Sequence, residues 1–481
     1  MYCVLTEKTA LRSWPHVPYA YYTKEDPYAK SLTKDEFEHL LLCDGKSDLK
    51  PDETIQHLLK KGLIRECKKG ERNSSWSSFR KYENRYFPKM NFMMTGKCNC
   101  NCLHCFNAAD NAPIMSEWSY EEAVDLLDQA EACGVNAITI TGGEPMLHRR
   151  FMDIVKAIYD RGMFVEELNT NGCFIDQQVL GKFRELGCSP KIKISFDGLG
   201  CHDWMRNRKG AEKQTLEAME LCIKNGFRVI SQTQVHRRNL HTIMDTAQRL
   251  SDMGVKMLRL IRTTETPRWA MNAPDSCLSI EEYYDKMLDF AASYRELDTK
   301  MELIIWQFMR LHPYNRSYSL DPVHCADGNY NPSAPLCKGV RGMIGVTSSK
   351  DVIPCLQLTG VFGDRGITLG NLAASSLKEL LTGSEYLDFA CANLSDKKLS
   401  GTKCSSCGYF KYCTGGCPAL SMLFSGDQYG PDPTKCLFFE NGWYQKCVEK
   451  MGDWRNLDSI SPLRDAYPRS VCQSGHMQQQ R

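Results

Sequence analysis

The sequence predicts an α/β fold in which a partial (β/α)6 barrel lies between a small N-terminal winged-helix-like domain and a C-terminal cysteine-rich domain. Between residues 92 and 310, short β-rich runs alternate with amphipathic helical runs, at the spacing of roughly 30 to 40 residues that βα units have. A polar run at 68–78 precedes this region as a linker, and the last third is rich in cysteine. We therefore expect domains at 1–88, 89–310 and 311–450, followed by a tail at 451–481.

The composition bounds the class of protein. The chain has 481 residues, 42% of them hydrophobic and 25% charged, and is longer than one hydrophobic core usually supports. Its 60 basic and 58 acidic residues nearly balance, so no nucleic-acid partner is indicated. It shows no signal peptide and no apolar run of about eighteen residues, so we expect neither export nor a membrane span. The 24 cysteines therefore indicate a metal protein of the reducing cytoplasm.

The N-terminal domain contains three recognisable elements. Residues 17–22 have the composition of a strand, 33–42 form a helix with its own N-cap, and 54–63 form a second helix that ends at Gly62. The order resembles the peptide-recognition element of ribosomal-peptide biosynthesis, which binds a leader peptide by adding a strand to a sheet edge. A generic winged helix or a capping subdomain is the alternative.

The barrel is predicted from six strand-like runs, at 91–95, 137–141, 164–169, 191–196, 229–235 and 255–261. Ser119 with Glu122, and Ser279 with Glu282, form capping boxes ahead of helical runs. In such folds cofactors bind at the carboxyl ends of the strands. The loops that would share this face contain Cys98, Gly142, Asn171 and Asp197.

Cys98, Cys102 and Cys105 stand in a C-x3-C-x2-C arrangement that indicates a redox metal centre. Thiolates are the soft ligands of iron–sulfur clusters and zinc, and three of them leave one iron of a four-iron cluster open to another ligand. The alternative is a structural zinc site with Cys100 or His104 as the fourth ligand.

Together with the run Gly142, Gly143, Glu144 and Pro145, these cysteines resemble the two signatures of the radical S-adenosylmethionine (SAM) superfamily. The resemblance implies that the open iron is chelated by the amino and carboxylate groups of SAM. It also implies that the glycine backbone approaches the methionyl amino group, which glycine permits. His104 stands where the family commonly has an aromatic residue, which leaves the adenine contact open.

Two further loops resemble elements of peptide-modifying members of the superfamily. Asn171 ends the third strand, and Ser195 and Asp197 end the fourth, followed by Arg206. The resemblance implies contacts with the SAM ribose, with the SAM carboxylate and with the substrate pocket. Asn-Gly and Asp-Gly pairs are otherwise common turn formers, and Arg206 either pairs with a carboxylate or is simply exposed.

The C-terminal cysteines resemble the SPASM domain of radical SAM peptide maturases. The resemblance implies two auxiliary four-iron clusters: an outer one on Cys404, Cys407, Cys413 and Cys436, and an inner one on Cys337, Cys355 and Cys417. Cys325 is a candidate for the fourth inner ligand. Lys350 replaces the glycine that usually lies five residues before Cys355, and a zinc ribbon is the alternative for residues 404–417. We expect Cys133, Cys188 and Cys222 to be buried core residues instead.

These resemblances imply a radical SAM enzyme with three four-iron clusters, one binding SAM and two auxiliary, and a reducing partner such as flavodoxin or ferredoxin. Such enzymes cleave SAM reductively to a 5′-deoxyadenosyl radical that abstracts hydrogen from an unactivated C–H bond. The expected substrate is a ribosomally made precursor peptide with a leader, and the expected product a cysteine thioether.

Other outcomes remain open at this point. Leu356 replaces the acidic residue that sulfatase-maturing members have after the aligned cysteine, which counts against that activity. Carbon–carbon crosslinking and epimerisation are further possibilities, and a non-catalytic metal-binding scaffold is the alternative of a different class.

Overall fold

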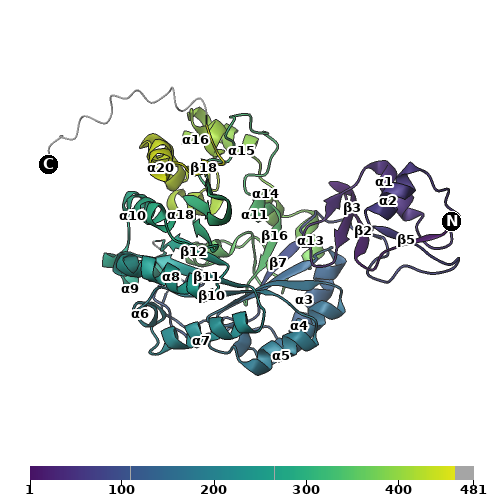
Figure 1. Ribbon diagram of the computed structural model, residues 1–481, viewed down its shortest axis with the longest axis horizontal. Coiled ribbons are helices and arrows are strands. Elements are labelled where there is room, and N and C mark those ends of the chain that lie inside the picture. The colour runs from purple at the N-terminus through teal and green to yellow at the C-terminus, as the bar shows by residue number, and fades with distance from the viewer. Residues whose placement is uncertain (109, 265, 461–481) are drawn as a thin grey trace.

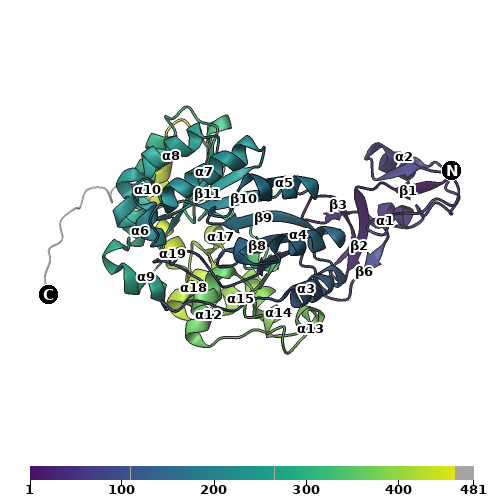
Figure 2. The same ribbon diagram turned by 90° about the horizontal axis from the view of Figure 1, so that it is seen from below.

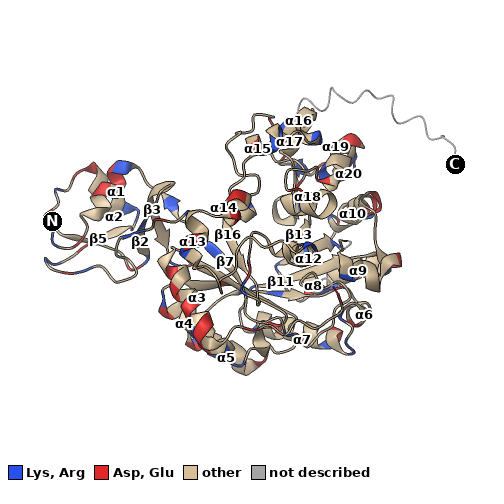
Figure 3. Cartoon of the chain, turned by 180° about the vertical axis from the view of Figure 1, so that it is seen from behind, with Lys and Arg blue, Asp and Glu red and all other residues tan. Residues whose placement is uncertain are grey.

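A computed structural model describes residues 1–108, 110–264 and 266–460, so most of the predicted tail lies outside the described residues. The chain forms an N-terminal unit, a barrel-like sheet with outer helices, and a C-terminal helical part (Figure 1). The N-terminal unit projects from one side of the molecule in two perpendicular views (Figures 1 and 2). Lys and Arg residues and Asp and Glu residues occur in all three parts (Figure 3). Among the described residues, no helix has both the length and the apolar character needed to cross a membrane.

The N-terminal unit combines two small sheets and two helices. One sheet pairs β1 (Cys3–Leu5) with β5 (Ile64–Glu66), and the other has the order β4 (Lys30–Ser31), β3 (Val17–Thr23), β2 (Thr9–Trp14) and β6 (Arg80–Lys81). The helices are α1 (Lys34–Leu41), which Thr33 and Glu36 cap reciprocally, and α2 (Glu53–Lys60), which Asp52 caps. The predicted strand and both predicted helices are confirmed, whereas the winged-helix assignment stays a prediction.

The segment 68–78 is not the free linker that its polarity predicts. Ser77 is fully buried, and the Arg12 guanidinium donates hydrogen bonds to the carbonyls of Trp76 at 2.7 Å and Ser78 at 2.8 Å. Polar side chains are compatible with this packing because backbone carbonyls of the segment satisfy a buried arginine. The segment therefore belongs to the N-terminal unit.

The N-terminal unit is fixed to the barrel at the C-terminal end of helix α3 (Tyr120–Ala132). The Tyr22 hydroxyl donates to the Gly134 carbonyl at 3.0 Å, and the Asn84 amide donates to the Cys133 carbonyl at 2.9 Å. Gly134 has a φ of +80°, and a Cβ there would lie 2.6 Å from the Trp14 ring. The unit thus supplies partners for helix-end carbonyls that would otherwise lack them.

The barrel has the six parallel strands that the sequence predicts, in chain order. They are β7 (Lys89–Met93), β8 (Ala137–Thr141), β9 (Phe164–Thr170), β10 (Lys191–Ser195), β11 (Val229–Val235) and β12 (Met257–Arg262). The helices between and after them are α3, α4 (Phe151–Asp160), α5 (Gln177–Glu185), α6 (His202–Arg206), α7 (Ala211–Lys224), α8 (Ile243–Asp252), α9 (Pro267–Asn272) and α10 (Ile280–Tyr294). Both predicted capping boxes, at Ser119 and Ser279, are present.

Alternate strand residues separate an apolar from a polar face. Ile138 and Ile140 on β8, and Ile192 and Ile194 on β10, belong to the main hydrophobic core. The intervening residues, such as Thr139 and Lys193, are polar, and successive side chains of a strand point to opposite faces. The inner face of the sheet is therefore polar, as a face that holds a ligand would be. The predicted core cysteines Cys133, Cys188 and Cys222 are buried, with 1%, 3% and 0% of their surface exposed.

The sheet continues beyond the six barrel strands at both edges. At one edge follow β13 (Glu302–Ile305), β14 (Met309–His312), β15 (Ser317–Leu320) and β18 (Arg455–Asn456); at the other, β16 (Met343–Val346) and β17 (Val352–Ile353). The predicted boundary at residue 310 falls within β14. Barrel and C-terminal part therefore share one twelve-stranded sheet among the described residues.

The C-terminal part consists mainly of short helices. They are α11 (Lys338–Arg341), α12 (Thr359–Arg365), α13 (Leu377–Thr382), α14 (Glu385–Ala390), α15 (Leu394–Leu399), α16 (Lys403–Ser406), α17 (Phe410–Cys413), α18 (Pro418–Ser425), α19 (Pro433–Glu440) and α20 (Trp443–Met451). Lys350, where the sequence lacks the expected glycine, has a φ of +72°. The turn before Cys355 thus keeps a left-handed conformation that glycine adopts at lower cost.

Candidate metal centres

The loop after β7 carries Cys98, Cys102 and Cys105. The Cys100 amide donates to the Cys98 sulfur at 3.4 Å, and Nη1 of Arg206 donates to the Cys102 sulfur at 3.6 Å. A hydrogen bond from the Cys100 thiol and the nearby Arg206 guanidinium lower the pKa of Cys102. Because the thiolate is the form that binds metal, this environment favours ligation.

Cys105 has a different environment from the other two cysteines. Burial raises the pKa of its thiol to about 11. A metal ion lowers the pKa of a coordinating thiol by direct ligation. Ligation by Cys105 would therefore release its proton when the metal binds.

The glycine run packs against the chain that leads into the cysteine loop. A Cβ on Gly143 would lie 2.2 Å from the Lys97 carbonyl oxygen, and one on Gly142 would lie 2.4 Å from that of Thr95. The Gly143 amide donates to the Thr95 carbonyl at 2.7 Å, and the Glu144 amide donates to the Lys97 carbonyl at 2.9 Å. The glycines thus allow the two loops to approach each other closely, and their approach to the SAM amino group stays a prediction.

Glu144 is fully buried and connects the second and third strand-end loops. Its carboxylate accepts hydrogen bonds from the Thr170 hydroxyl at 2.9 Å and from the Asn171 amide at 2.8 Å. Burial raises its pKa to about 7, although these hydrogen bonds oppose the shift. Pro145 begins a short 3-10 helix, η1 (Pro145–Leu147).

Asn171 reaches from this network to the cysteine loop. Its side-chain amide donates to the Asn99 side-chain oxygen at 2.7 Å and lies 3.9 Å from the Cys98 sulfur. The structure therefore brings the Cys98, Gly142 and Asn171 loops together at one edge of the sheet, as their positions after parallel strands predict.

Asp197 and Arg206 pair with each other. Asp197 Oδ2 lies 2.7 Å from Arg206 Nε, and the two residues are 0% and 7% exposed. Burial acts to raise the pKa of Asp197, but the Arg206 guanidinium together with a hydrogen bond from His202 and the nearby His104 holds that pKa well below its usual range. Arg206 is thus buried between a carboxylate and the Cys102 thiol, while Ser195 ends β10 two residues before Asp197.

Three residues of this site were not predicted from the sequence, namely Cys173, Arg208 and Arg268. Cys173 accepts a hydrogen bond at 2.7 Å from Nη1 of Arg208, and Arg268 donates to the side chain of Asn101 in the cysteine loop. Cys173 directly follows the Asn171-Gly172 pair, so the rule that strand ends share one face would have found it. Nothing in the local sequence marks Arg268, which comes from α9.

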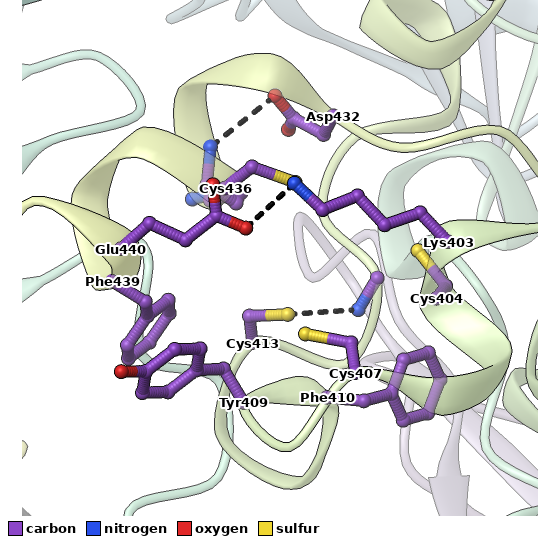
Figure 4. A pocket seen from close by; sticks show the side chains of 12 residues that line it. Lys403, Cys404, Cys407, Tyr409, Phe410, Cys413, Asp432, Cys436, Phe439 and Glu440 are labelled. Carbon is purple, nitrogen blue, oxygen red and sulfur yellow. Dashed lines mark hydrogen bonds and ion pairs between the residues drawn. The ribbon is translucent and has the colours of Figure 1, made fainter.

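The four cysteines predicted for the outer cluster line one cavity. Figure 4 shows Cys404, Cys407, Cys413 and Cys436 arranged around a common space. The unfilled space around these side chains is narrow and continuous with solvent. Among the described residues, no three His, Cys, Asp or Glu side chains converge closely enough to hold a single metal ion. The donor set is all thiol, which suits an iron–sulfur cluster.

The three cysteines predicted for the inner cluster also lie near one another. Burial raises the pKa of Cys355 to about 12, and the neighbouring thiols of Cys417 and Cys337 act in the same direction. Cys325 has other surroundings, since its thiol donates to the Asp327 carboxylate at 3.1 Å. The fourth inner ligand therefore stays open.

Comparison with known proteins identifies both regions. Residues 92–250 match the model of the radical SAM superfamily, and residues 337–408 match SPASM, an iron–sulfur cluster-binding domain. Residues 92–250 therefore form a radical SAM domain and residues 337–408 a SPASM domain. The chain is accordingly an enzyme of the radical SAM type, whose chemistry uses SAM and iron–sulfur clusters.

Individual relatives are distant. The chain is 25% identical over 350 residues to an AdoMet-dependent heme synthase of Methanosarcina barkeri, covering 72% of this chain and 95% of the relative. It is 21% identical over 368 residues to a PqqA peptide cyclase of Granulibacter bethesdensis, covering 75% and 90%. The solved structure of Streptococcus suis SuiB bound to precursor peptide SuiA is similar in fold, with a TM-score of 0.62, 12% identity and coverage of 90% of this chain and 99% of SuiB.

Proposed function

We propose that this radical SAM enzyme modifies a ribosomally made precursor peptide whose leader binds to residues 1–88, and that it forms a cysteine thioether. The observation that carries the proposal is the N-terminal unit, which is folded and fixed to the barrel through Trp14, Tyr22 and Asn84. A radical SAM barrel does not need such a unit for the chemistry itself. A device that binds part of a large substrate would explain it.

The similarity to SuiB extends into this unit. It leaves about 10% of the chain uncovered, which is roughly 48 of 481 residues and fewer than the 88 residues of the unit. At least part of residues 1–88 must therefore have a counterpart in SuiB, whose structure contains a precursor peptide. This supports a peptide substrate for the present chain.

Cys98, Cys102 and Cys105 would hold the cluster that binds SAM. When bound, this cluster supplies the electron that cleaves SAM to a 5′-deoxyadenosyl radical. The proposed SAM contacts come from Gly142, Gly143, Glu144, Pro145, Asn171, Ser195 and Asp197. The buried Glu144 carboxylate orients the Asn171 backbone, so these loops are preorganised around one another before SAM arrives.

Asp197 and Arg206 are the proposed catalytic pair. Asp197 holds the guanidinium in place, and the guanidinium in turn donates to the Cys102 sulfur. A fixed positive charge beside a ligand thiolate stabilises that thiolate and favours binding of an anionic group nearby. The pair would thus orient both the metal site and a carboxylate of SAM or substrate.

The proposed auxiliary clusters use two sets of cysteines. Cys404, Cys407, Cys413 and Cys436 would hold the outer one, and Cys337, Cys355 and Cys417 the inner one, with Cys325 or a substrate thiolate as the fourth ligand. A substrate thiolate at the inner cluster would place a cysteine sulfur for bond formation. An external electron donor such as flavodoxin or ferredoxin would supply reducing equivalents.

The similarity to a heme synthase over 95% of its length favours a second candidate, in which the substrate is a tetrapyrrole. The two candidates differ in what they require of the N-terminal unit. Surface substitutions within residues 1–88 that abolish peptide modification should leave tetrapyrrole binding intact. Titration of the full chain with iron coproporphyrin, followed by its absorbance, tests the second candidate directly.

Mass spectrometry of a cysteine-containing peptide encoded beside this gene tests the first candidate. The peptide is co-expressed anaerobically with the wild type and with Cys98→Ala. Loss of two hydrogens per site, absent with Cys98→Ala, is expected, and tandem spectra locate the bond at sulfur for a thioether or at carbon for a carbon–carbon crosslink. Unchanged mass with deuterium taken up from solvent would indicate epimerisation. No change in any cysteine-containing peptide would refute peptide maturation.

A further inference from the structure

Two lysines are buried in the C-terminal part and form no ion pair with any carboxylate of the described residues. Lys397 on α15 is 0% exposed and Lys435 on α19 is 4% exposed. The Lys397 ammonium donates to the Gly415 carbonyl at 2.5 Å and to the Ser421 hydroxyl at 3.2 Å. The Lys435 ammonium donates to the Asp321 carbonyl at 2.7 Å. Among the residues that the structure describes, neither ammonium lies within 4 Å of a carboxylate oxygen.

Burying an ammonium is costly unless an opposite charge compensates it. Two carboxylates act on these lysines. Asp432 is 1% exposed and accepts hydrogen bonds from the amides of Cys417 at 2.8 Å and Thr434 at 2.9 Å. Asp321 also acts on Lys435, but its carboxylate is already paired with Arg310 at 2.8 Å. Asp432 alone cannot balance two ammonium groups. The described residues of this region therefore leave a buried positive charge that requires a further anion.

Both lysines lie beside the predicted cluster ligands. The groups that act electrostatically on Lys397 include Cys404 and Cys413 of the outer set and Cys417 of the inner set. Lys435 lines the outer cavity and is affected by Cys413 and Cys417. The two positive charges are thus placed next to, and between, the two sets of thiols.

The backbone between Cys413 and Cys417 is shaped to admit these side chains. A Cβ on Gly415 would lie 2.6 Å from Lys397 Cδ, and a Cβ on Gly416 would lie 2.5 Å from Asp432 Cβ and 2.8 Å from Lys435 Cγ. Both glycines have positive φ values, +87° and +74°. A larger residue would clash with Lys397 at Gly415, and with Asp432 and Lys435 at Gly416, so the turn, the two lysines and Asp432 form one built arrangement.

We propose that Lys397 and Lys435 are positioning residues whose positive charges compensate the thiolate-ligated auxiliary clusters and raise their reduction potentials. The proposal rests on the auxiliary clusters proposed above. A four-iron cluster with cysteine ligands is a net anion, and one-electron reduction makes it more negative. A fixed buried cation nearby favours the reduced form, because the local dielectric constant is low.

The test is a redox titration of the full-length protein, monitored by electron paramagnetic resonance. The background is Cys98→Ala/Cys102→Ala/Cys105→Ala, so that only auxiliary clusters contribute signals. Lys397→Met and Lys435→Met should each lower the reduction potential of an auxiliary cluster. At a fixed applied potential, the ratio of oxidised to reduced cluster should rise at least tenfold, which corresponds to about 59 mV for one electron. Lys411→Met is the matched control, because Lys411 belongs to the same part but is exposed, and its potentials should equal those of the background.

Unchanged potentials in both lysine variants, at the iron and sulfide content of the background, would overturn the proposal. If the Met variants lose iron, Lys397→Arg and Lys435→Arg decide between charge and packing. Arg variants that retain iron and the background potentials support the proposed role of the positive charge. Arg variants that lose iron overturn the proposal, because the lysines would then serve in packing. If the background itself holds no iron or sulfide, the auxiliary clusters are absent and the proposal fails with them. Peptide modification is measured separately with the wild-type enzyme. Failure of the lysine proposal can therefore be distinguished from failure of the proposed peptide maturation.

Discussion

The buried pair of Asp197 and Arg206 offers a quantitative test of the site. Asp197→Asn removes the negative charge but keeps the shape of the side chain. The Gln234 amide can still donate to Oδ1, as it does now at 3.1 Å, and the Asn239 amide still bonds the backbone carbonyl of residue 197. The main change is therefore that the Arg206 guanidinium loses its carboxylate partner at 2.7 Å and keeps only the Cys102 sulfur at 3.6 Å.

The magnitude follows from burial. Removing one member of a buried ion pair costs about 3–5 kcal/mol, because the other charge stays buried without compensation. Asp197→Asn and Arg206→Met should each lower the free energy of unfolding by about that amount. The double variant leaves no buried charge from the pair, so its loss should fall short of the sum of the two by about 2 kcal/mol or more.

Anaerobic urea unfolding of the metal-free protein, followed by tryptophan fluorescence, measures these differences from the transition midpoints at constant slope. The exposed pair of Arg316 and Asp453, at a similar distance of 2.8 Å, is the control. Asp453→Asn should change the free energy of unfolding by less than about 0.5 kcal/mol, because exposed pairs contribute little. Additive effects of the two buried substitutions would refute the pairing argument, as would equal effects at the buried and exposed pairs.

Three further outcomes are expected. Burial raises the pKa of Glu144 from 4.5 to about 7, so between these pH values the folded protein without SAM keeps a proton on Glu144 that the unfolded chain has lost. The free energy of unfolding should therefore fall by about 3 kcal/mol as the pH rises from below 4.5 through 7. Gly143→Ala should reduce iron and SAM binding together, because its Cβ would lie 2.2 Å from the Lys97 carbonyl oxygen. Gly134→Ala should loosen the N-terminal unit and speed its release by limited proteolysis, since its Cβ would lie 2.6 Å from Trp14.

Each outcome has a matched control and a result that contradicts it. Glu144→Gln should flatten the pH dependence measured by thermal unfolding, and an unchanged slope would assign the effect elsewhere. Gly181→Ala, with nothing within 4 Å of its Cβ, should keep full iron content, and equal losses in both alanine variants would exclude the clash at Gly143. Gly187, where φ is +68° and the space around its Cβ is also open, controls for backbone strain alone: Gly187→Ala should leave the proteolysis rate of the N-terminal unit unchanged.

Sequence patterns predicted the elements whose signals are local. The strand at 137–141 and the strand at 229–235 have the expected bounds, because continuous apolar or alternating runs sit between clear turn residues. The capping boxes at Ser119 and Ser279 formed as expected, since they depend on residues three positions apart. The grouping of the C-terminal cysteines rests on the resemblance to the SPASM domain rather than on their spacing, since Cys337, Cys355 and Cys417 lie in separate segments, and it stays a prediction.

Contacts between distant segments could not be predicted in this way. The pairing of Asp197 with Arg206 depends on α6 folding back over the end of β10, and the contact of Arg268 with Asn101 depends on α9 reaching the cysteine loop. Lys350 keeps a positive φ because the surrounding turn fixes the backbone, although its side chain opposes that conformation. The segment 68–78 is polar yet packed, because its backbone rather than its side chains satisfies Arg12.

The strand β7 links the three parts of the chain physically. It follows the N-terminal unit directly, it pairs with β8 on one side and with β16 from the C-terminal part on the other, and it ends at the loop that carries Cys98. The C-terminal part also contacts that loop, since the Gly360 amide donates to the Phe106 carbonyl at 3.1 Å. A shift of the N-terminal unit on binding a peptide would act on β7, and through it on the cysteine loop and on the strand that precedes Cys355. Recognition of a leader and the state of the metal sites would therefore be coupled through one buried strand rather than through a flexible tether.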